Sequence, residues 1–475
     1  GQGFYKHFTS LDEDLRERVV APGVSVAGDS DVQTLAWVGG KTLWVGGTDV
    51  WGPPSFWQVE ALSLSDGVTT TLDLTAHDVW GEVPNGTMEA GDLDFDGDDE
   101  MVFATAAVLT PTFTISILEL ALSPAPTITR THTITLAVPD DGRVLDVAIG
   151  DLDGDGRQDE VVLAYHGDGD LHVIVFEYLT VTHALDYRAH KVLPSPRPDF
   201  GNGDVEAAVG KVFDRHPAHG RLSGKQLIVA ASHRSTLPYD DTQYVHTEVY
   251  SMALTSPDWS FVELDAVDGP DYHLIPTEVD VTTDDLNADG LAEIIYSRGR
   301  GIRVIDYNPA SGNRRQIAFA PGDDDRVDPR RVDLAVGDID MDGKAEIGYW
   351  TEDDRVAVLE LVDEGTLHQS GSVAPSVSYG KLLMGDLDDD SFRAELVGCT
   401  TFSEISVIAV LNGAPRPYAD GVPAQDTGVR YAKTASGGSS SAWGTTTNLG
   451  GFLSVGFEIE INAPLIGTKL GEVRG

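Results

Sequence analysis

The sequence has 475 residues, with 32 Lys and Arg against 77 Asp and Glu, and its formal net charge at pH 7 is −45. Such a charge repels the phosphates of nucleic acids and anionic membrane surfaces, so we expect neither as a partner. The length exceeds the usual size of a single hydrophobic core and favours several domains or a repeat architecture. No run of 18 apolar residues occurs, so the sequence predicts no transmembrane segment.

The first 90 residues contain a helical signal and a group of tryptophans. The signal covers residues 11–19, with Ser10 as its N-cap. Five of the eight tryptophans lie in this region. We expect them to fill the space between packed sheets, and the alternative is an exposed platform on which sugars stack. The five are Trp37, Trp44, Trp51, Trp57 and Trp80.

Four acidic loops follow, starting at Asp92, Asp151, Asp285 and Asp338. In each, oxygen-bearing side chains alternate with other residues, and glycine stands at the sixth position. Ca²⁺ takes six to eight oxygen ligands, and this spacing folds several of them around one point. The glycine permits the sharp turn that the loop needs. A looser fifth copy has Ser391 in place of glycine, and its candidate ligands are Asp386, Asp388 and Asp390. The sequence therefore predicts four to five structural Ca²⁺ ions.

An EF-hand is excluded by the residue at loop position 12, where that motif requires a bidentate glutamate. Here the position is occupied by Phe103, Val162, Tyr296 or Tyr349. The residues on both sides of each loop form short β-rich runs rather than helices. We therefore expect calcium loops inside β-hairpins.

Each loop belongs to a longer phrase of small or apolar residues, an acidic loop and an apolar strand. Degenerate copies of the phrase place the starts of seven units near residues 29, 92, 151, 211, 285, 338 and 386. Strand-rich units at such spacings are typical of propeller blades. In the unit of Asp151 we expect strands over 159–165, 171–179 and 183–193, after the strand that enters the loop. The last unit is one strand short, and residues 3–20 are expected to supply that strand.

The unit that starts near residue 211 carries two extra loops, over 214–225 and 233–247. The first of them is locally basic, which would suit an anionic partner on so acidic a molecule. A solvated insertion is the interpretation that we favour. The basic residues are Arg215, His216, His219, Arg221 and Lys225.

The phrase Gly150-Asp151-Leu152-Asp153-Gly154-Asp155-Gly156, followed by an apolar strand, resembles the FG-GAP or VCBS repeat, and the resemblance covers roughly residues 20–412. It implies a seven-bladed β-propeller like that of integrin α subunits and many bacterial surface proteins. It also implies Ca²⁺ between the first two strands of a blade, held by side chains at loop positions 1, 3, 5 and 9 and by the carbonyl at position 7. The implied ligands are Asp92, Asp94, Asp96, Asp98 and Glu100; Asp151, Asp153, Asp155, Arg157 and Asp159; Asp285, Asn287, Asp289, Leu291 and Glu293; and Asp338, Asp340, Asp342, Lys344 and Glu346.

The expected fold is thus all-β, with a seven-bladed propeller over residues 1–412 and a linker with the start of a separate β-rich segment over 413–475. The Ser/Thr/Gly-rich tail resembles β segments of aerolysin-like pore-forming proteins. It stops abruptly, so we expect the natural chain to continue, and any membrane association would need that missing region.

Weak calcium loops would be empty in the cytosol, so we expect an extracellular or cell-surface protein whose export signal is not present in this chain. The only cysteine, Cys399, leaves no intramolecular disulfide. No metalloprotease, phosphate-loop or nucleophile-elbow motif occurs, and the sequence nominates no catalytic residue. We expect a non-enzymatic adhesion scaffold that contacts protein or carbohydrate. The alternatives are a polysaccharide lyase or hydrolase, and the targeting module of a pore-forming protein.

Overall fold

The computed structural model describes the backbone of residues 5–11, 17–25, 30–38, 42–49, 57–63, 69–72, 86–106, 112–121, 127–137, 145–167, 169–194, 200–216, 218–235, 244–255, 258–268, 272–273, 279–298, 301–308, 313–319, 333–339, 342–350, 356–363, 366–373, 381–385, 395–402, 428–435, 439–448, 452–463 and 466–474. The side chains that it describes lie between residues 86 and 384. Every regular element in these ranges is a β-strand. Within them, no helix is long and apolar enough to cross a membrane.

Seven sheets, numbered here in chain order, share one plan of four antiparallel strands. Sheet 1 contains β3 (Ser30–Val38), β4 (Thr42–Asp49), β5 (Trp57–Ser63) and β6 (Thr69–Leu72). Sheet 2 contains β7 (Gly86–Gly91), β8 (Glu100–Ala106), β9 (Thr112–Ala121) and β10 (Thr127–Ala137). Sheet 3 contains β11 (Leu145–Gly150), β12 (Glu160–Gly167), β13 (Asp170–Leu179) and β14 (Ala184–Leu193). The strands of each of these sheets pair in the order of the chain.

Sheets 4 to 6 repeat this order. Sheet 4 contains β15 (Phe200–Gly210), β18 (Gln226–Ser235), β19 (Tyr244–Thr255) and β20 (Ser260–Asp268), and the short β21 (Tyr272–His273) also pairs with β19. Sheet 5 contains β22 (Val279–Asp284), β23 (Glu293–Arg298), β24 (Gly301–Tyr307) and β25 (Arg314–Phe319). Sheet 6 contains β26 (Leu334–Gly337), β27 (Glu346–Trp350), β28 (Val356–Asp363) and β29 (Thr366–Val373).

Sheet 7 joins the two ends of the ring. It consists of β30 (Lys381–Gly385), β31 (Glu395–Phe402), β1 (Tyr5–Leu11) and β2 (Glu17–Ser25), paired in the order β2-β1-β31-β30. The sequence predicts that residues 3–20 add one strand to this sheet. They do contribute a strand, β1, and β2 adds a second one beside it. The helix expected over 11–19 is wrong at both of its ends, because Leu11 pairs with Leu396 and residues 17–19 belong to β2. Strand pairing across the sheet overrides the local helical preference.

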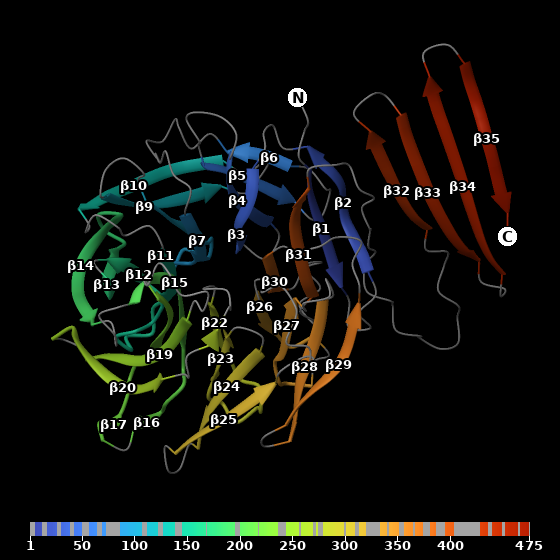
Figure 1. Ribbon diagram of the computed structural model, residues 1–475. Helices are drawn as coiled ribbons and strands as arrows, with labels where there is room; N and C mark the ends of the chain where they lie inside the picture. Colours follow the sequence, from blue (N-terminus) through green and yellow to red (C-terminus); the bar gives the residue numbers. More distant parts are fainter. Residues whose placement is uncertain are drawn as a thin grey trace.

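The sheets surround a common centre (Figure 1). Their first strands, β3, β7, β11, β15, β22, β26 and β30, contact one another in succession, and β30 contacts β3 again. The ring is therefore closed by backbone packing. This is the arrangement of a β-propeller, and the predicted all-β propeller class is confirmed.

The second strand β12 carries a continuous apolar run after Glu160, because both of its faces are covered there. On β12, Val161 and Leu163 pack into the hydrophobic core shared with sheet 2. Val162 and Ala164, between and beside them, pack into the core shared with sheet 4. Successive side chains of a strand point to opposite faces, so a strand between two neighbouring sheets is apolar on both faces. Full burial of one such Val or Leu stabilises the fold by about 1.5–3 kcal/mol.

The inserted segments of sheet 4 differ from their expected form. The first contains a small hairpin, β16 (Arg215–His216) and β17 (Gly220–Arg221). Of the second, expected to be a loop over 233–247, the described residues belong to strands: 233–235 to β18 and 244–247 to β19, and His233 pairs with His246. The β-branched residues Val245, Thr247 and Val249 recur at every second position and suit a strand.

The tail forms a sheet of its own, which stands beside the ring in Figure 1. It contains β32 (Gly428–Ala435), β33 (Ser439–Asn448), β34 (Phe452–Ala463) and β35 (Ile466–Arg474), paired in chain order. Strand β32 contacts β2 of sheet 7. The side chains of the five N-terminal tryptophans and of Cys399 lie outside the described part of the chain.

Candidate calcium-binding loops

The four acidic loops occupy one structural position, between the first and second strands of sheets 2, 3, 5 and 6. The last residue of the first strand pairs with the first residue of the second strand, as Gly91 does with Glu100 and Gly150 with Glu160. Asp284 pairs in the same way with Glu293, and Gly337 with Glu346. The loops therefore lie at the same end of the propeller.

Each loop is organised by its first carboxylate. Asp92 Oδ2 accepts a hydrogen bond from the amide of Gly97 at 3.2 Å, and Asp151 Oδ2 accepts one from Gly156 at 3.1 Å. The corresponding bonds are 2.8 Å from Gly290 to Asp285 and 3.0 Å from Gly343 to Asp338. The four glycines have φ angles of 92°, 93°, 86° and 87°, a conformation that residues with a Cβ rarely adopt.

The carboxylates at positions 3 and 5 bind the backbone in the same repeated way. The amide of Asp155 donates to Asp153 Oδ1 at 2.9 Å, and the amide of Arg157 donates to Asp155 Oδ1 at 2.9 Å. Every described loop has the bond to position 5; its donor is Asp98, Arg157, Leu291 or Lys344 at position 7. These bonds turn the side-chain oxygens towards the inside of the loop.

A buried glutamate closes each loop from the first position of the second strand. Glu100, Glu160, Glu293 and Glu346 are at most 4% exposed. In each case Oε2 accepts the backbone amide of the residue at loop position 2, at 2.8, 2.8, 2.7 and 2.8 Å. The loop of Asp151 is one residue longer than the other three. The glutamate that closes it is therefore Glu160, at loop position 10. Asp159, which the sequence analysis matched to position 9, directly precedes this glutamate.

The pKa values of three of these glutamates are raised, chiefly by burial and also by the neighbouring acidic side chains. Desolvation raises the pKa of Glu100 and of Glu293 to about 8 and that of Glu160 to about 9. The hydrogen bond from the position 2 amide opposes this shift in all three. Clustered carboxylates in a partly buried site favour a bound cation, which restores their charged form.

The donor set fits Ca²⁺. Asp92 Oδ1 and Asp338 Oδ1 are buried and have no hydrogen-bond partner. One carboxylate oxygen from each of positions 1, 3 and 5 lies within 4.8 Å of the others in the loops of Asp92 and Asp151. All of these ligand atoms are oxygens, as a hard cation requires. In the loop of Asp285, Asn287 offers an amide oxygen, and its Nδ2 donates to Glu293 Oε1 at 2.6 Å.

Some of the predicted ligands lie outside the described residues. These are Asp340 in the fourth loop and all three candidates of the fifth loop, Asp386, Asp388 and Asp390.

Neighbouring loops are joined to one another through backbone hydrogen bonds. The carbonyl of Asp151 accepts the amide of Lys225 at 2.7 Å, that of Lys211 accepts Ala292 at 2.9 Å, and that of Asp285 accepts Ala345 at 3.0 Å. In each pair, the first residue of one loop holds the residue that precedes the second strand of the next sheet. Order in one loop therefore supports order in the next.

The replaced loop of sheet 4 keeps the closing bond without the charge. Gln226 stands where the other loops have glutamate and pairs with Gly210. Its Oε1 accepts the amide of Phe213 at 2.6 Å, which is the third rather than the second residue of this loop. A neutral amide is thus sufficient to close the loop. The acidic loops use a charged group in the same place.

Sequence analysis missed a set of aspartates that fasten the first strands together. Asp146 Oδ2 accepts the amide of Ala207 at 2.8 Å, Asp204 Oδ2 accepts that of Val279 at 3.1 Å, and Asp280 Oδ2 accepts that of Leu334 at 2.7 Å. Asp333 holds Leu382 in the same way. Three of the four (Asp146, Asp280 and Asp333) lie four residues before the end of the first strand, and this recurrence was the available signal.

Comparisons with known proteins show a likeness in fold only. No family model and no curated protein matches the sequence. The periplasmic gluconolactonase PpgL of Pseudomonas aeruginosa is 14% identical, with 78% of this chain and 96% of that chain covered and a TM-score of 0.41. An Agrocybe aegerita lectin that recognises non-reducing terminal N-acetylglucosamine is 12% identical, with coverages of 84% and 95% and a TM-score of 0.39. The β-propeller domain of the Pyrococcus furiosus trilobed protease is 11% identical, with coverages of 88% and 94% and a TM-score of 0.32. Such low values say nothing of what this chain binds.

Proposed function

We propose that the chain is a calcium-stabilised, non-enzymatic binding scaffold of the extracellular space or cell surface. The observation that carries the proposal is the hydrogen-bond pattern shared by the four loops. In the loops of Asp92 and Asp151, the carboxylate oxygens of positions 1, 3 and 5 also lie within 4.8 Å of one another. Residues at positions 1, 3 and 5, with the closing glutamate beside them, would hold Ca²⁺ there. The ion would supply positive charge among carboxylates that otherwise repel one another.

The stabilisation expected from each ion follows from mass action. A site with a Kd of about 10⁻⁴ M in millimolar calcium stabilises the folded state by roughly 1–2 kcal/mol. The ion would fasten the first two strands of a sheet, and the backbone bonds between loops would extend the effect to the next sheet. A rigid propeller would then present its faces to a ligand.

Calcium titration tests the metal part of this proposal. We expect isothermal titration calorimetry of the chelator-treated protein to give four or five calcium sites, and Asp96→Asn to remove one of them. Asp186, a half-buried aspartate on β14 that pairs with Arg188 at 2.9 Å, provides a control as Asp186→Asn, which should leave the stoichiometry unchanged. A wild-type protein that takes up no calcium at millimolar concentration would contradict the proposal.

The binding part concerns carbohydrate or protein ligands. A glycan array probed in calcium and in EDTA, with product analysis of any bound polymer, separates the outcomes. Calcium-dependent binding of an intact glycan supports the scaffold, whereas shortened or unsaturated products would establish an enzyme. No binding to any glycan would direct the search to protein ligands.

A further inference from the structure

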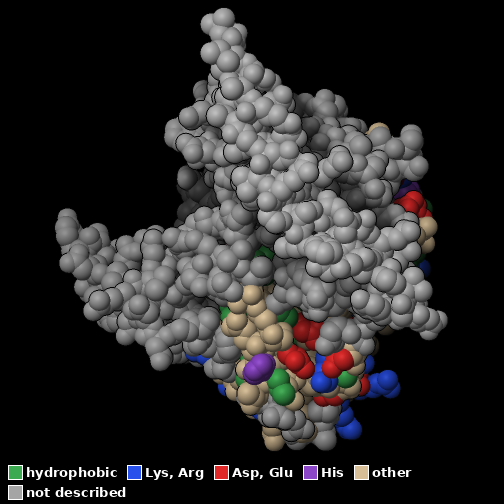
Figure 2. All heavy atoms as spheres, turned by 90° about the vertical axis from the view of Figure 1, so that its right-hand side faces the viewer, with side chains coloured by type: hydrophobic (Ala, Val, Ile, Leu, Met, Phe, Trp, Pro, Cys, Tyr) green, Lys and Arg blue, Asp and Glu red, His purple; other side chains and the backbone are tan. Residues whose placement is uncertain are grey.

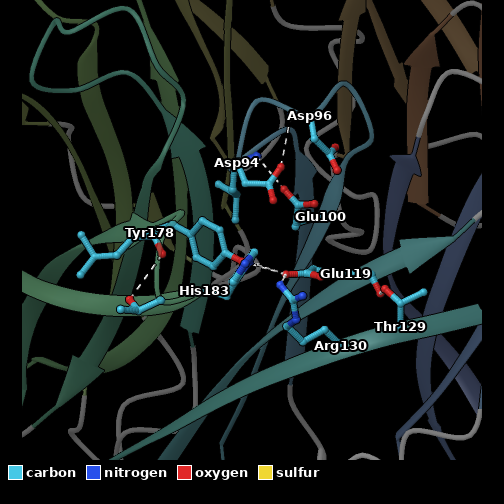
Figure 3. Close-up of polar contacts among 11 residues, drawn as sticks. Asp94, Asp96, Glu100, Glu119, Thr129, Arg130, Tyr178 and His183 are labelled. Atoms are coloured by element: carbon cyan, nitrogen blue, oxygen red, sulfur yellow. Dashed lines mark hydrogen bonds and ion pairs between the residues drawn. The ribbon is translucent and has the colours of Figure 1, made fainter.

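A second cluster of metal-ligating side chains lies beside the loop of Asp92, at the boundary between sheets 2 and 3 (Figure 3). Asp94 comes from the loop itself, Glu119 from β9 of the same sheet, and His183 from the turn between β13 and β14 of the next sheet. Figure 3 shows the three side chains directed towards one another. The cluster thus combines groups from both sheets.

The three groups are close enough to share one ion. One carboxylate oxygen from each acid and one ring nitrogen of His183 all lie within 4.8 Å of one another. The distance from His183 Nδ1 to Glu119 Oε1 is 2.8 Å. A tetrahedral ion with bonds of about 2.0–2.1 Å separates its ligand atoms by about 3.3 Å, so the pair would open by about half an ångström.

The surroundings hold these groups in place. The side chain of Glu119 is 16% exposed and that of His183 is 31% exposed. Tyr178, which is 1% exposed, places its hydroxyl 3.2 Å from both Glu119 Oε1 and His183 Nδ1. Arg130 also donates to Glu119 Oε1, at 2.6 Å, but its side chain is 48% exposed and is free to move into solvent.

The ligand types determine which ion fits. Calcium prefers oxygen ligands alone, whereas an imidazole nitrogen with two carboxylates suits first-row divalent ions such as Zn²⁺. Three protein ligands leave one position for water, as in open zinc sites. The site therefore differs in kind from the neighbouring loop, although the two share Asp94.

We propose that Asp94, Glu119 and His183 form a binding site for a divalent first-row transition metal ion, which bridges sheets 2 and 3 next to the calcium loop. Its ligands Glu119 and His183 lie outside the loop, so the site does not require that the loop hold calcium. The bound ion would join two sheets, whereas the calcium loops act within one sheet.

Zinc titration of the full chain, without a polyhistidine tag and in saturating calcium, tests the proposal. We expect the wild type to bind one Zn²⁺ at micromolar concentration, and His183→Asn and Glu119→Gln each to weaken binding at least tenfold. Asparagine suits position 183 because His183 has a φ of 49°, which asparagine tolerates. His368→Asn, at an exposed histidine on β29, is the matched control and should leave the affinity unchanged.

Two further measurements separate this site from the calcium loops. Co²⁺ in place of Zn²⁺ should give a visible absorption band in wild type that is lost in His183→Asn. Asp96→Asn should remove a calcium ion and retain zinc binding. The proposal is overturned if the wild type binds no zinc at micromolar concentration, or if the two site variants bind it as tightly as the control; the cluster would then be an ion-pair network only.

Discussion

At the scale of single residues, the glutamate that begins the second strand has two separable roles. Its Oε2 accepts a backbone amide, and its charge faces the carboxylates of the loop. Gln226 performs the first role in the loop that lacks the aspartates. Closing the turn therefore does not by itself explain why Glu100 and its counterparts are acids, whereas the proposed cation would.

Glu100→Gln separates the two roles. The amide oxygen of glutamine can still accept the hydrogen bond of the Leu93 amide, so we expect the free energy of unfolding in EDTA to change little. In saturating calcium, the variant should lose roughly 1–2 kcal/mol of stabilisation, the contribution of one ion. Chemical unfolding with and without calcium measures both values. A loss of equal size in EDTA would show that the charge serves the fold rather than the ion.

His166 gives the fold a dependence on pH. It is completely buried, and burial, followed by the neighbouring His233, lowers its pKa from 6.5 to about 4. The unfolded chain therefore binds a proton between pH 6.5 and pH 4 that the folded chain does not, and stability falls as the pH is lowered through this window. Glu248, which lies 3.4 Å from His233, has its pKa lowered from 4.5 to about 2, so its own contribution is lost mainly as the pH falls between these two values.

We expect the wild type to lose about 2 kcal/mol between about pH 7 and about pH 5 through His166 alone. Because other groups also titrate there, the measurement is the difference between wild type and His166→Leu in urea unfolding at both pH values with saturating calcium. The variant should lack this part of the loss, whereas His368→Leu should retain it. Equal pH dependence of all three proteins would rule out His166 as its source.

At the scale of elements, the small residue at the end of the first strand sets how closely neighbouring sheets approach. A Cβ on Gly150 would lie 2.3 Å from Val209 Cγ1, whereas a Cβ on Gly91 would lie 3.3 Å from Ile149 Cγ2. We expect Gly150→Ala to destabilise the protein by about 1–3 kcal/mol and Gly91→Ala by clearly less. Val209→Ala should offset part of the Gly150→Ala effect in a double-mutant cycle followed by denaturant unfolding. Additive effects would show that the two residues are not in conflict.

Most strands and turns of the ring could be predicted from the sequence because the same order of apolar run and acidic loop recurs in successive units. Apolar runs such as 161–164 and the spacing of the acidic loops predicted strands, turns and the propeller class. The one-residue offset at Asp159 was harder to see, because two acids stand side by side and only the pairing of Gly150 with Glu160 distinguishes them.

Contacts between sheets could not be predicted in this way. The Asp94, Glu119 and His183 cluster depends on where the turn after β13 lies relative to the previous sheet, and no local pattern encodes that. The aspartates that hold neighbouring first strands do recur at one position in three sheets, but the recurrence does not tell which backbone amide each of them binds. The local sequence pattern identified the acidic loops, whereas the contacts between neighbouring sheets became known only from the three-dimensional structure.

At the scale of the whole molecule, the net charge of −45 opposes compactness. Most of the described side chains visible in Figure 2 lie in the lower part of the view, with a few more at its right edge. The lower group mixes acidic with basic side chains, which reduces the repulsion locally. Four or five calcium ions would cancel about eight to ten charges. The loaded protein would remain strongly acidic.

Salt and calcium should therefore both raise the melting temperature, because each reduces the repulsion between negative charges. We expect EDTA to lower the melting temperature, and an increase of NaCl from about 0.02 M to about 0.2 M to stabilise the calcium-free protein more than the loaded one, because screening acts on the unneutralised charge. Differential scanning calorimetry of both forms at the two salt concentrations measures this. A melting temperature that does not respond to EDTA would exclude a structural role for calcium.

The closure of sheet 7 has a consequence for the time course of synthesis. Strand β1 pairs with β31, so its partner is made only after almost the whole ring. At roughly 5–20 residues per second, about 20–80 s separate the two strands on the ribosome. Throughout this interval the edge of β1 that β31 later covers lacks its partner, and such unpaired edges are prone to pair with other chains. The newly made protein is thus exposed to aggregation through this edge until β31 is synthesised and pairs with β1.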